Sequence, residues 1–386
     1  MRRETAMSET RSPVTAPASG LRIDRIEAIP VVVPLERRYR GSYYHMDRRC
    51  TIVTRVYTDA GVVGESYNGD TDEGQAAILR IIADELTPAL VGRDAFAYEL
   101  NWEVMLPSSF DILRDRTLSM QAIACVDTAL WDAIGKALGM PLWKLWGGSW
   151  REVPAIMIGG YYESSDAELA AEMERYVELG YAGCKFKVGR LTPAEDARRI
   201  EVARRAGGES FVLMADANQG YTREDAIEFA RRTRDLNLVW FEEPCRWQND
   251  RLAMRDVRMM AGIPVTAGQS EVSRGGIRDL MASGSVDYCN ADCSWIGGPT
   301  EWRRLAAMAR AYDVKMAHHE EAHISVHFFA SIPHGSYVES FHPERDPIAW
   351  NMVANRPQLK AGLYPAPTGP GLGLELDEAF IAKYRA

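Results

Sequence analysis

Three short apolar runs decide the fold, and each ends in polar residues: Gly183-Cys184-Lys185-Phe186-Lys187-Val188-Gly189, Phe211-Val212-Leu213-Met214-Ala215-Asp216-Ala217-Asn218-Gln219-Gly220, and Leu238-Val239-Trp240-Phe241-Glu242-Glu243-Pro244. Successive side chains of a strand point to opposite faces, so Lys185 and Lys187 share a face, as do Asp216 and Asn218. Lysines and carboxylates are rarely buried unless they are paired or bind a metal. The runs therefore indicate an active site at the ends of neighbouring strands.

Similar short apolar runs continue through the middle of the chain, where they alternate with segments that are expected to form helices with one polar face. We expect helices over residues 166–179, 193–206, 223–235 and 300–311. The runs begin near Val153, Gly183, Phe211, Leu238, Pro264, Val286, Val314 and Ser336. Eight strand–helix units of roughly 20 to 30 residues are typical of a (β/α)₈ barrel, whose catalytic residues follow the carboxyl ends of the strands.

The chain before the barrel has a different pattern. Strand-like residues dominate to about Val63, and helical periodicity dominates from Asp72 to Gly139. Between the first two strands, residues 37–45 are polar and aromatic, which predicts either a loop that covers a ligand or an ordinary surface loop; Tyr43 is a candidate substrate contact. We expect a disordered tail over residues 1–20, a first domain over 21–150, the barrel over 151–350, and a segment over 351–386 that packs back on the first domain.

Composition excludes several classes of protein. The 386 residues carry a net charge of −9, and no basic block suggests a nucleic-acid partner. No apolar stretch reaches the roughly 18 residues of a membrane span, and nothing resembles a signal peptide. The six cysteines form no CxxC pair and lie mostly in apolar runs. We therefore expect a cytoplasmic protein with reduced thiols that acts on a small molecule.

Carboxylates at consecutive strand ends predict a metal site. Asp216 and Glu242 end the second and third runs, and the fifth run, residues 264–271, supplies Gln269 or Glu271. Hard oxygen ligands on a rigid frame suit Mg²⁺. Each acid alone is more typical of a surface or capping residue, but three on successive strands favour the metal site. Asn218 then contacts the substrate or supports a ligand.

Acid/base candidates flank that site. Lys187 is one, because Lys185 and a divalent cation beside it are expected to lower its pKa; a solvated surface pair is the alternative. The sixth run ends in Asp292 and the seventh in His318-His319. A carboxylate that orients an imidazole is a common acid/base device, so we pair Asp292 with His319 and keep His318 as the alternate and as a candidate substrate contact.

The eighth run carries Glu339, which can bind substrate, donate a proton or be structural. Lysine and histidine on opposite sides of a metal fit removal of a proton next to a carboxylate. Fixed donors and a divalent cation stabilise the enediolate charge that this step creates.

Taken together, these motifs resemble the enolase superfamily and its mandelate racemase-like subgroup, whose sites use a Lys or His base with Mg²⁺. The resemblance runs from Leu21 to the end of the chain. The motifs on which the resemblance rests are Lys185-Phe186-Lys187, Asp216-Ala217-Asn218, Trp240-Phe241-Glu242-Glu243-Pro244, Asp292 ahead of Gly297-Gly298, His319 ahead of Ile324-Ser325-Val326-His327, and the helix Ala129 to Gly139.

The resemblance implies an α/β fold: a modified TIM barrel, (β/α)₇β, under an α+β capping domain that the C-terminal segment completes. It also implies that Lys187 and the His319–Asp292 pair exchange protons, that Asp216 and Glu242 hold Mg²⁺, and that Glu339 is an electrophilic or substrate-binding acid. The loop around Tyr43 would close over substrate, and the protein would form a homo-oligomer.

Two departures from the family pattern stand out. Gln269 occupies the position where the third metal ligand is usually a carboxylate, and Glu271, two residues on, is the alternative ligand. Trp295 lies in the segment Cys293-Ser294-Trp295, where the subgroup's racemases often carry a lysine. This tryptophan would line the substrate pocket or simply pack.

The favoured activity is acid sugar dehydration to a 2-keto-3-deoxy acid, because Tyr43, Tyr44, His45, Arg48 and Arg49 suit a hydroxylated substrate. A racemase or epimerase of a 2-hydroxy acid is the alternative. A sugar-acid-binding barrel without turnover is less favoured, and a Schiff-base aldolase using Lys187 would not need the carboxylate set.

Overall fold

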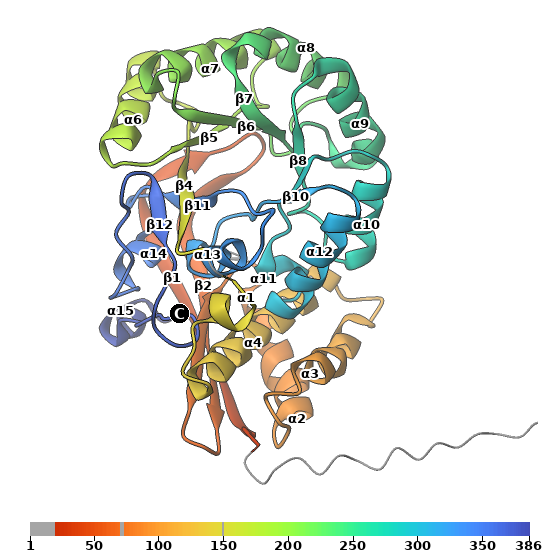
Figure 1. The fold of residues 1–386 in the computed structure, drawn as a ribbon, viewed down its shortest axis with the longest axis vertical. Coiled ribbons are helices and arrows are strands. Elements are labelled where there is room, and N and C mark those ends of the chain that lie inside the picture. The colour runs from red at the N-terminus through yellow and green to blue at the C-terminus, as the bar shows by residue number, and fades with distance from the viewer. Residues whose placement is uncertain (1–19, 70–72, 149) are drawn as a thin grey trace, which may run out of the picture.

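A computed structural model describes residues 20–69, 73–148 and 150–386. Apart from Gly20, the expected tail over residues 1–20 lies outside the described residues. Figure 1 shows the helices between residues 166 and 282 (α6 to α10) arching around one end of the molecule, with the sheet of residues 23–58 (β1 and β2) and the helices between residues 75 and 137 (α1 to α4) at the other.

The centre of the molecule is a barrel of eight parallel strands in the order β10-β9-β8-β7-β6-β5-β4-β11. A parallel bridge between Met316 and Gly335 joins β10 to the segment entering β11 and closes the ring. The strands are β4 (Glu152–Gly159), β5 (Gly183–Lys187), β6 (Val212–Asp216), β7 (Leu238–Glu242), β8 (Val265–Ala267), β9 (Tyr288–Cys289), β10 (Lys315–Met316) and β11 (Val338–Phe341).

Helices cover the outside of the barrel, and local sequence sets where several begin. Ser165 and Thr192 form capping boxes with glutamates three residues later, at the starts of α6 and α7. The barrel helices are α6 (Asp166–Glu178), α7 (Pro193–Gly207), α8 (Arg223–Arg232), α9 (Asp250–Ala261), α10 (Arg274–Ala282), α11 (Cys293–Ile296), α12 (Pro299–Ala311) and α13 (Ala322–Ser331), with short 3₁₀ turns η3 (Arg234–Leu236) and η4 (Trp247–Asn249). Seven strand–helix units and an eighth strand make this the (β/α)₇β barrel expected from the sequence.

The capping domain begins with an antiparallel sheet, β1 (Ile23–Arg40), β2 (His45–Thr58) and β3 (Val63–Asn68). The long helix α4 packs on this sheet so closely that a Cβ at Gly64 would lie 2.1 Å from the Ala129 carbonyl oxygen. The helical part contains α1 (Gln75–Ile81), π-helix η1 (Ile82–Leu86), α2 (Thr87–Leu90), α3 (Tyr98–Met105), 3₁₀ turn η2 (Leu106–Ser109), α4 (Arg116–Ala137) and α5 (Leu142–Leu145).

The segment expected to be a loop over residues 37–45 is mostly strand. β1 continues to Arg40 because Tyr39 pairs with Met46 and Arg40 with His45, which leaves only a tight turn between the two strands. This hairpin tip carries Tyr44 and His45 to the wall of the cavity described below.

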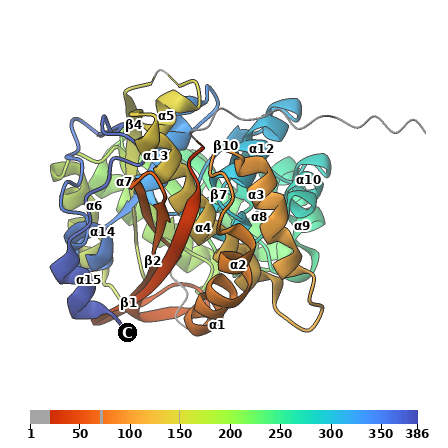
Figure 2. The same cartoon turned by 90° about the horizontal axis from the view of Figure 1, so that it is seen from below.

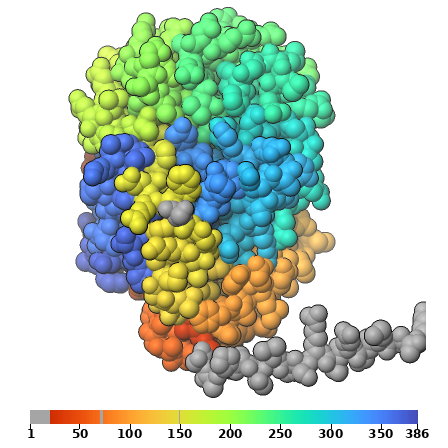
Figure 3. Space-filling view, viewed as in Figure 1, coloured from red at the N-terminus to blue at the C-terminus, as the bar shows by residue number. Residues whose placement is uncertain are grey.

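The C-terminal segment returns to the capping sheet, as the sequence predicts. It contains α14 (Pro347–Asn351), β12 (Leu363–Pro365), which pairs with β4, and α15 (Glu378–Tyr384). Ile348, Met352 and Ile381 share an apolar cluster with Val31 and Val53 of the sheet. Figure 2 shows α15 beside β1, and Figure 3 shows the segment in blue against the residues around α5 in yellow, where Leu142 N donates to Gly371 O.

The cysteines and the helices agree with two expectations from composition. All six cysteines are buried thiols. Within the described ranges, no helix has the length and apolar character needed to cross a bilayer.

His327 on α13 joins the capping helices to the C-terminal segment. Its Nδ1 accepts from Trp143 N at 3.2 Å, and its Nε2 donates to Leu372 O at 3.1 Å. Burial lowers the pKa of this imidazole to about 4. The folded protein therefore holds His327 neutral where an unfolded chain already takes up a proton, and stability falls as pH drops from about 6.5 toward 4.

We predict that His327→Gln destabilises the protein by about 1–3 kcal/mol at pH 8, because two backbone groups lose their partner. The variant should also lose stability less steeply between pH 6.5 and 4.5, by roughly one proton, because the glutamine amide does not titrate. Urea denaturation across this pH range measures both effects, and His45→Gln, at an exposed position, is the control. Parallel stability curves for His327→Gln and the native protein would refute the linkage.

Candidate active site

Lys185 lies at the centre of the barrel and is fully buried. Its Nζ is 2.8 Å from Glu242 Oε1, 2.6 Å from Glu339 Oε1 and 3.9 Å from Asp216 Oδ2. These carboxylates come from β7, β11 and β6, so one ammonium group ties together strands from different sides of the barrel. Trp240 also donates from its indole to Glu242 Oε2 at 3.1 Å.

Lys187 follows Lys185 on the same face of β5, as strand alternation predicts. Its Nζ donates to Asp216 Oδ2 at 2.6 Å and to Asn218 Oδ1 at 3.0 Å. Burial alone would lower the pKa of Lys187, but the touching Asp216 carboxylate outweighs it and holds the pKa well above its usual value. The lowered pKa expected from the sequence took account of Lys185 and a bound divalent cation, but not of the contact between Lys187 and Asp216.

The donor set at the ends of β6, β7 and β8 fits a hard divalent cation. Burial and the nearby Asp216 and Glu339 charges raise the pKa of Glu242 well above normal, although Lys185 opposes this. Such crowding of buried carboxylates is relieved by positive charge. Oxygen atoms of Asp216, Glu242 and Gln269, on three adjacent strands, are the ligand type that Mg²⁺ takes.

Of the two candidates after β8, Gln269 lies on the cavity side. It is buried, and its Oε1 accepts from Asn290 Nδ2 at 3.1 Å, which fixes the amide. Glu271 turns away and meets Arg251 Nη2 at 2.5 Å; it lines a separate small hollow beside Glu243. The geometry therefore favours Gln269 as the third ligand.

The expected dyad forms at the ends of β9 and β10. His319 Nδ1 lies 2.8 Å from Asp292 Oδ2, and burial lowers the pKa of His319 to about 3. Because Nδ1 donates to the carboxylate, Nε2 carries the lone pair. Glu320 Oε1 is 3.6 Å from that Nε2, and Arg49 Nη2 is 2.5 Å from Glu320 Oε2.

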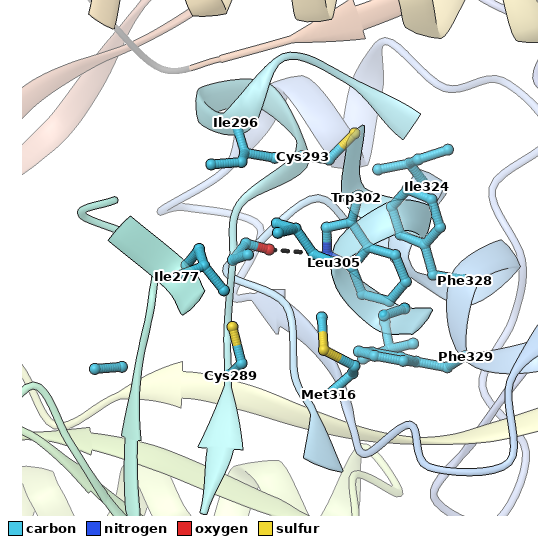
Figure 4. Close-up of a cluster of buried hydrophobic side chains, with 14 of the residues drawn as sticks. Ile277, Cys289, Cys293, Ile296, Trp302, Leu305, Met316, Ile324, Phe328 and Phe329 are labelled. Carbon is cyan, nitrogen blue, oxygen red and sulfur yellow. Dashed lines mark hydrogen bonds between the residues drawn. The ribbon is translucent and has the colours of Figure 1, made fainter. Parts of the chain in front are cut away.

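Apolar packing behind the dyad fixes its position. Trp302 stacks on Phe328 at a centroid distance of 4.0 Å and donates to the carbonyl of Ala291, next to Asp292 (Figure 4). His318 faces this cluster and accepts from Cys293 N at 3.1 Å. It is buried away from the cavity, so it supports the start of α11, and the geometry does not favour it as a substrate contact.

A cavity of about 520 Å³ opens above these groups, within the usual range for small-molecule sites. Of the residues singled out from the sequence, those that line it are Tyr44, His45, Arg48, Arg49, Lys187, Asn218, Gln269, Trp295 and His319. The Trp295 ring lies 5.8 Å from that of His319. Tyr43 is 73% exposed and outside this lining, whereas its neighbour Tyr44 contributes to the wall.

Among the wall residues that are absent from the candidates found in the sequence are Glu320 and Arg345. Both follow barrel strands, so the strand-end rule could have found them had it been extended past Glu339 and the two histidines. Glu320 and Glu321 both have left-handed backbone conformations, as do Asn218, Gln219 and Glu243. Such strained non-glycine residues cluster at functional sites, and here they follow β6, β7 and β10.

Comparison with known proteins agrees with this architecture. Residues 26–147 match the mandelate racemase / muconate lactonizing enzyme N-terminal domain, and residues 168–380 match the enolase C-terminal domain-like family. The 3,6-anhydro-alpha-L-galactonate cycloisomerase of Streptomyces coelicolor is 30% identical over 92% of this chain and 97% of its own. The arabinonate dehydratase of Saccharolobus solfataricus is 30% identical over 86% and 90%.

Solved structures show the same relationship. One described as a mandelate racemase/muconate lactonizing enzyme is 55% identical, with a TM-score of 0.93 over 95% of this chain and 100% of its own. Another, from a marine actinobacterium and in complex with magnesium, is 53% identical with a TM-score of 0.90 and the same coverage. The chain therefore belongs to the mandelate racemase/muconate lactonizing enzyme family of the enolase superfamily. It is an enolase-superfamily enzyme, and this family's chemistry is Mg²⁺-dependent removal of a proton next to a carboxylate.

We predict that Gln269→Glu tightens Mg²⁺ binding on the order of tenfold, because a charged oxygen replaces a neutral one, and that Gln269→Ala weakens it. Glu271→Gln should leave the affinity within about threefold, since Glu271 is engaged by Arg251. Isothermal titration with MgCl₂ measures all three. A large loss in Glu271→Gln with none in Gln269→Ala would reverse the assignment.

Proposed function

We propose that this enzyme is a Mg²⁺-dependent acid sugar dehydratase that converts a polyhydroxy carboxylate to a 2-keto-3-deoxy acid. The observation that carries the proposal is the placement of Lys187 and the His319–Asp292 pair on one cavity, at the ends of β5 and of β9 and β10. In the strand order β5 lies across the ring from β9, so the two groups approach a bound substrate from different sides.

Asp216, Glu242 and Gln269 would hold Mg²⁺, which neutralises the charge that gathers on the substrate carboxylate as the α-proton leaves. Lys185 holds the Glu242 and Glu339 carboxyl groups in place through contacts of 2.8 Å and 2.6 Å. Asn218 positions the Lys187 ammonium group through its Oδ1.

The two acid/base groups complete the elimination between them. One takes the α-proton, the electron pair forms the Cα=Cβ bond, and the β-hydroxyl leaves as water with a proton from the other; the enol product then becomes the 2-keto acid. In the resting protein His319 Nε2 has a free lone pair and Lys187 Nζ is an ammonium. His319 can therefore accept the α-proton, while the sequence suggested Lys187 as base and His319 as acid; deuterium exchange in the two variants distinguishes these assignments.

The cavity wall supports dehydration of a hydroxylated substrate. Tyr44, His45, Asp47 and Arg48 add hydroxyl, imidazole and charged groups opposite the barrel. Curated relatives named arabinonate, L-talarate/galactarate and D-mannonate dehydratases share 25–30% identity with this chain. Epimerisation is the second candidate, because acid/base groups on two sides of the substrate can also exchange the α-proton with inversion.

We predict that Lys187→Ala and His319→Asn each fold normally and reduce turnover of the true acid sugar by at least about 10²-fold. A panel of mono- and diacid sugars, incubated with Mg²⁺ in D₂O, identifies the substrate through its 2-keto product. If His319→Asn still exchanges the α-proton for deuterium, Lys187 is the base; if only Lys187→Ala does so, His319 is.

The same incubation separates the reactions. Deuterium exchange with inversion and no keto product would show an epimerase. Full activity in either variant would remove that residue from the mechanism.

A further inference from the structure

Arg345 is a cation held rigidly at the cavity wall. It lies in the loop after β11 and is 2% exposed. Its guanidinium stacks on the Phe341 ring at 4.4 Å, its Nε donates to Tyr161 Oη at 3.1 Å, and its Nη2 contacts Met46 Sδ at 2.9 Å. Ring stacking and one directional hydrogen bond fix the plane of the group, so its orientation is set before a ligand arrives.

This charge has no direct counter-ion in the part of the chain that the structure describes. Among the described residues, no carboxylate oxygen lies within 4.0 Å of the Arg345 guanidinium, and its buried Nη1 has no hydrogen-bond partner. The acids next to it are engaged elsewhere: Glu320 and Asp346 both pair with Arg49, at 2.5 Å and 3.4 Å. Methionine sulfur and tyrosine oxygen are weak compensation for a buried cation.

Topology places Arg345 after the strand that lies opposite the metal ligands, on the same cavity. In the ring order, β11 is directly across the barrel from β7, which carries Glu242, while β6 and β8 flank β7. A substrate whose first carboxylate lies at the β6–β8 side therefore extends its other end toward Arg345. Arginine is the side chain best suited to bind a carboxylate or phosphate through two nitrogens.

We propose that Arg345 forms a second anion subsite, so that the substrate of this enzyme carries an anionic group, a carboxylate or a phosphate, at the end remote from the reacting carboxylate. This inference rests on the proposed function for the orientation of the substrate. It narrows the substrate class from acid sugars in general to dianionic ones and makes Arg345 the residue that selects them.

Matched acids test the subsite directly. Gluconate, glucarate and 6-phosphogluconate share one configuration and differ at C6; galactonate and galactarate form a second set. Binding is measured by calorimetry with Mg²⁺ present, in His319→Asn protein so that turnover does not interfere. We expect a dianion of at least one set to bind at least about 30-fold tighter than its monoanion, and Arg345→Met to remove that preference.

Further variants separate charge from packing. Arg345→Lys should keep part of the preference, because the charge stays and the paired donors are lost, and Tyr161→Phe should weaken it by releasing Nε. Arg303→Met is the matched control: this arginine also stacks on aromatic rings, at 5.1 Å from Trp131, but outside the cavity. It should bind every acid as the native protein does.

The outcomes are distinct. A preference for the C6 carboxylate or for the C6 phosphate supports the subsite and identifies its anion. Equal binding of mono- and dianions, a preference that survives Arg345→Met, or no binding of any dianion overturns it. Activity of the native enzyme on the same acids tests dehydration separately. Dehydration of monoacids alone would refute the anion subsite but not the proposed reaction. Arg345-dependent binding of dianions without turnover would refute the proposed reaction but not the subsite.

Discussion

The rest of the structure depends on one buried ammonium group, that of Lys185. Three carboxylates from three strands converge on it without contact with solvent. Removing charges from water is expensive, and the attraction between them compensates only when every partner is in place. Lys185 therefore sets the spacing of Asp216, Glu242 and Glu339, and through Glu339, which accepts from Glu320 N at 2.8 Å, it also fixes the backbone that carries the His319 side of the cavity.

Much of the fold follows from local sequence. Each barrel strand begins within about two residues of the position that hydrophobic runs indicate, and the predicted helix over residues 166–179 is observed as α6, Asp166–Glu178. Side-chain caps such as Ser165 and Thr192 can be recognised in the sequence, and they mark where helices begin. The extent of β1 and β2 could not be predicted in this way, because their last residue pairs, such as Tyr39 with Met46, depend on contact between the two strands rather than on the sequence of either one. The domain boundaries near residues 150 and 350 stay predictions.

The candidate site can be partly predicted from the sequence, because local sequence also determines where the strands end. Alternation along β5 places Lys185 and Lys187 on one face, and the strand-end rule brings both to the same rim as Asp216 and His319. The direction in which a side chain points after a strand ends cannot be predicted from the sequence. Only the structure shows that Glu271 contacts Arg251 while Gln269 faces the cavity. Charge balance is also a property of the assembled barrel, which is why the raised pKa of Lys187 and the lone guanidinium of Arg345 could not be read from neighbouring residues. The roles of these side chains in catalysis stay predictions.

The return of α15 to β1 has a consequence for how the polypeptide is made. During vectorial synthesis, the β1–β2 hairpin leaves the ribosome before the barrel but lacks Ile348, Met352 and Ile381, which form part of its apolar cluster. The barrel strands from β4 to β11 emerge in spatial order and can pair with a neighbour as each appears. The capping sheet is thus synthesised before the barrel but completed after it, and its apolar strands stay exposed until residues 348–381 have been translated.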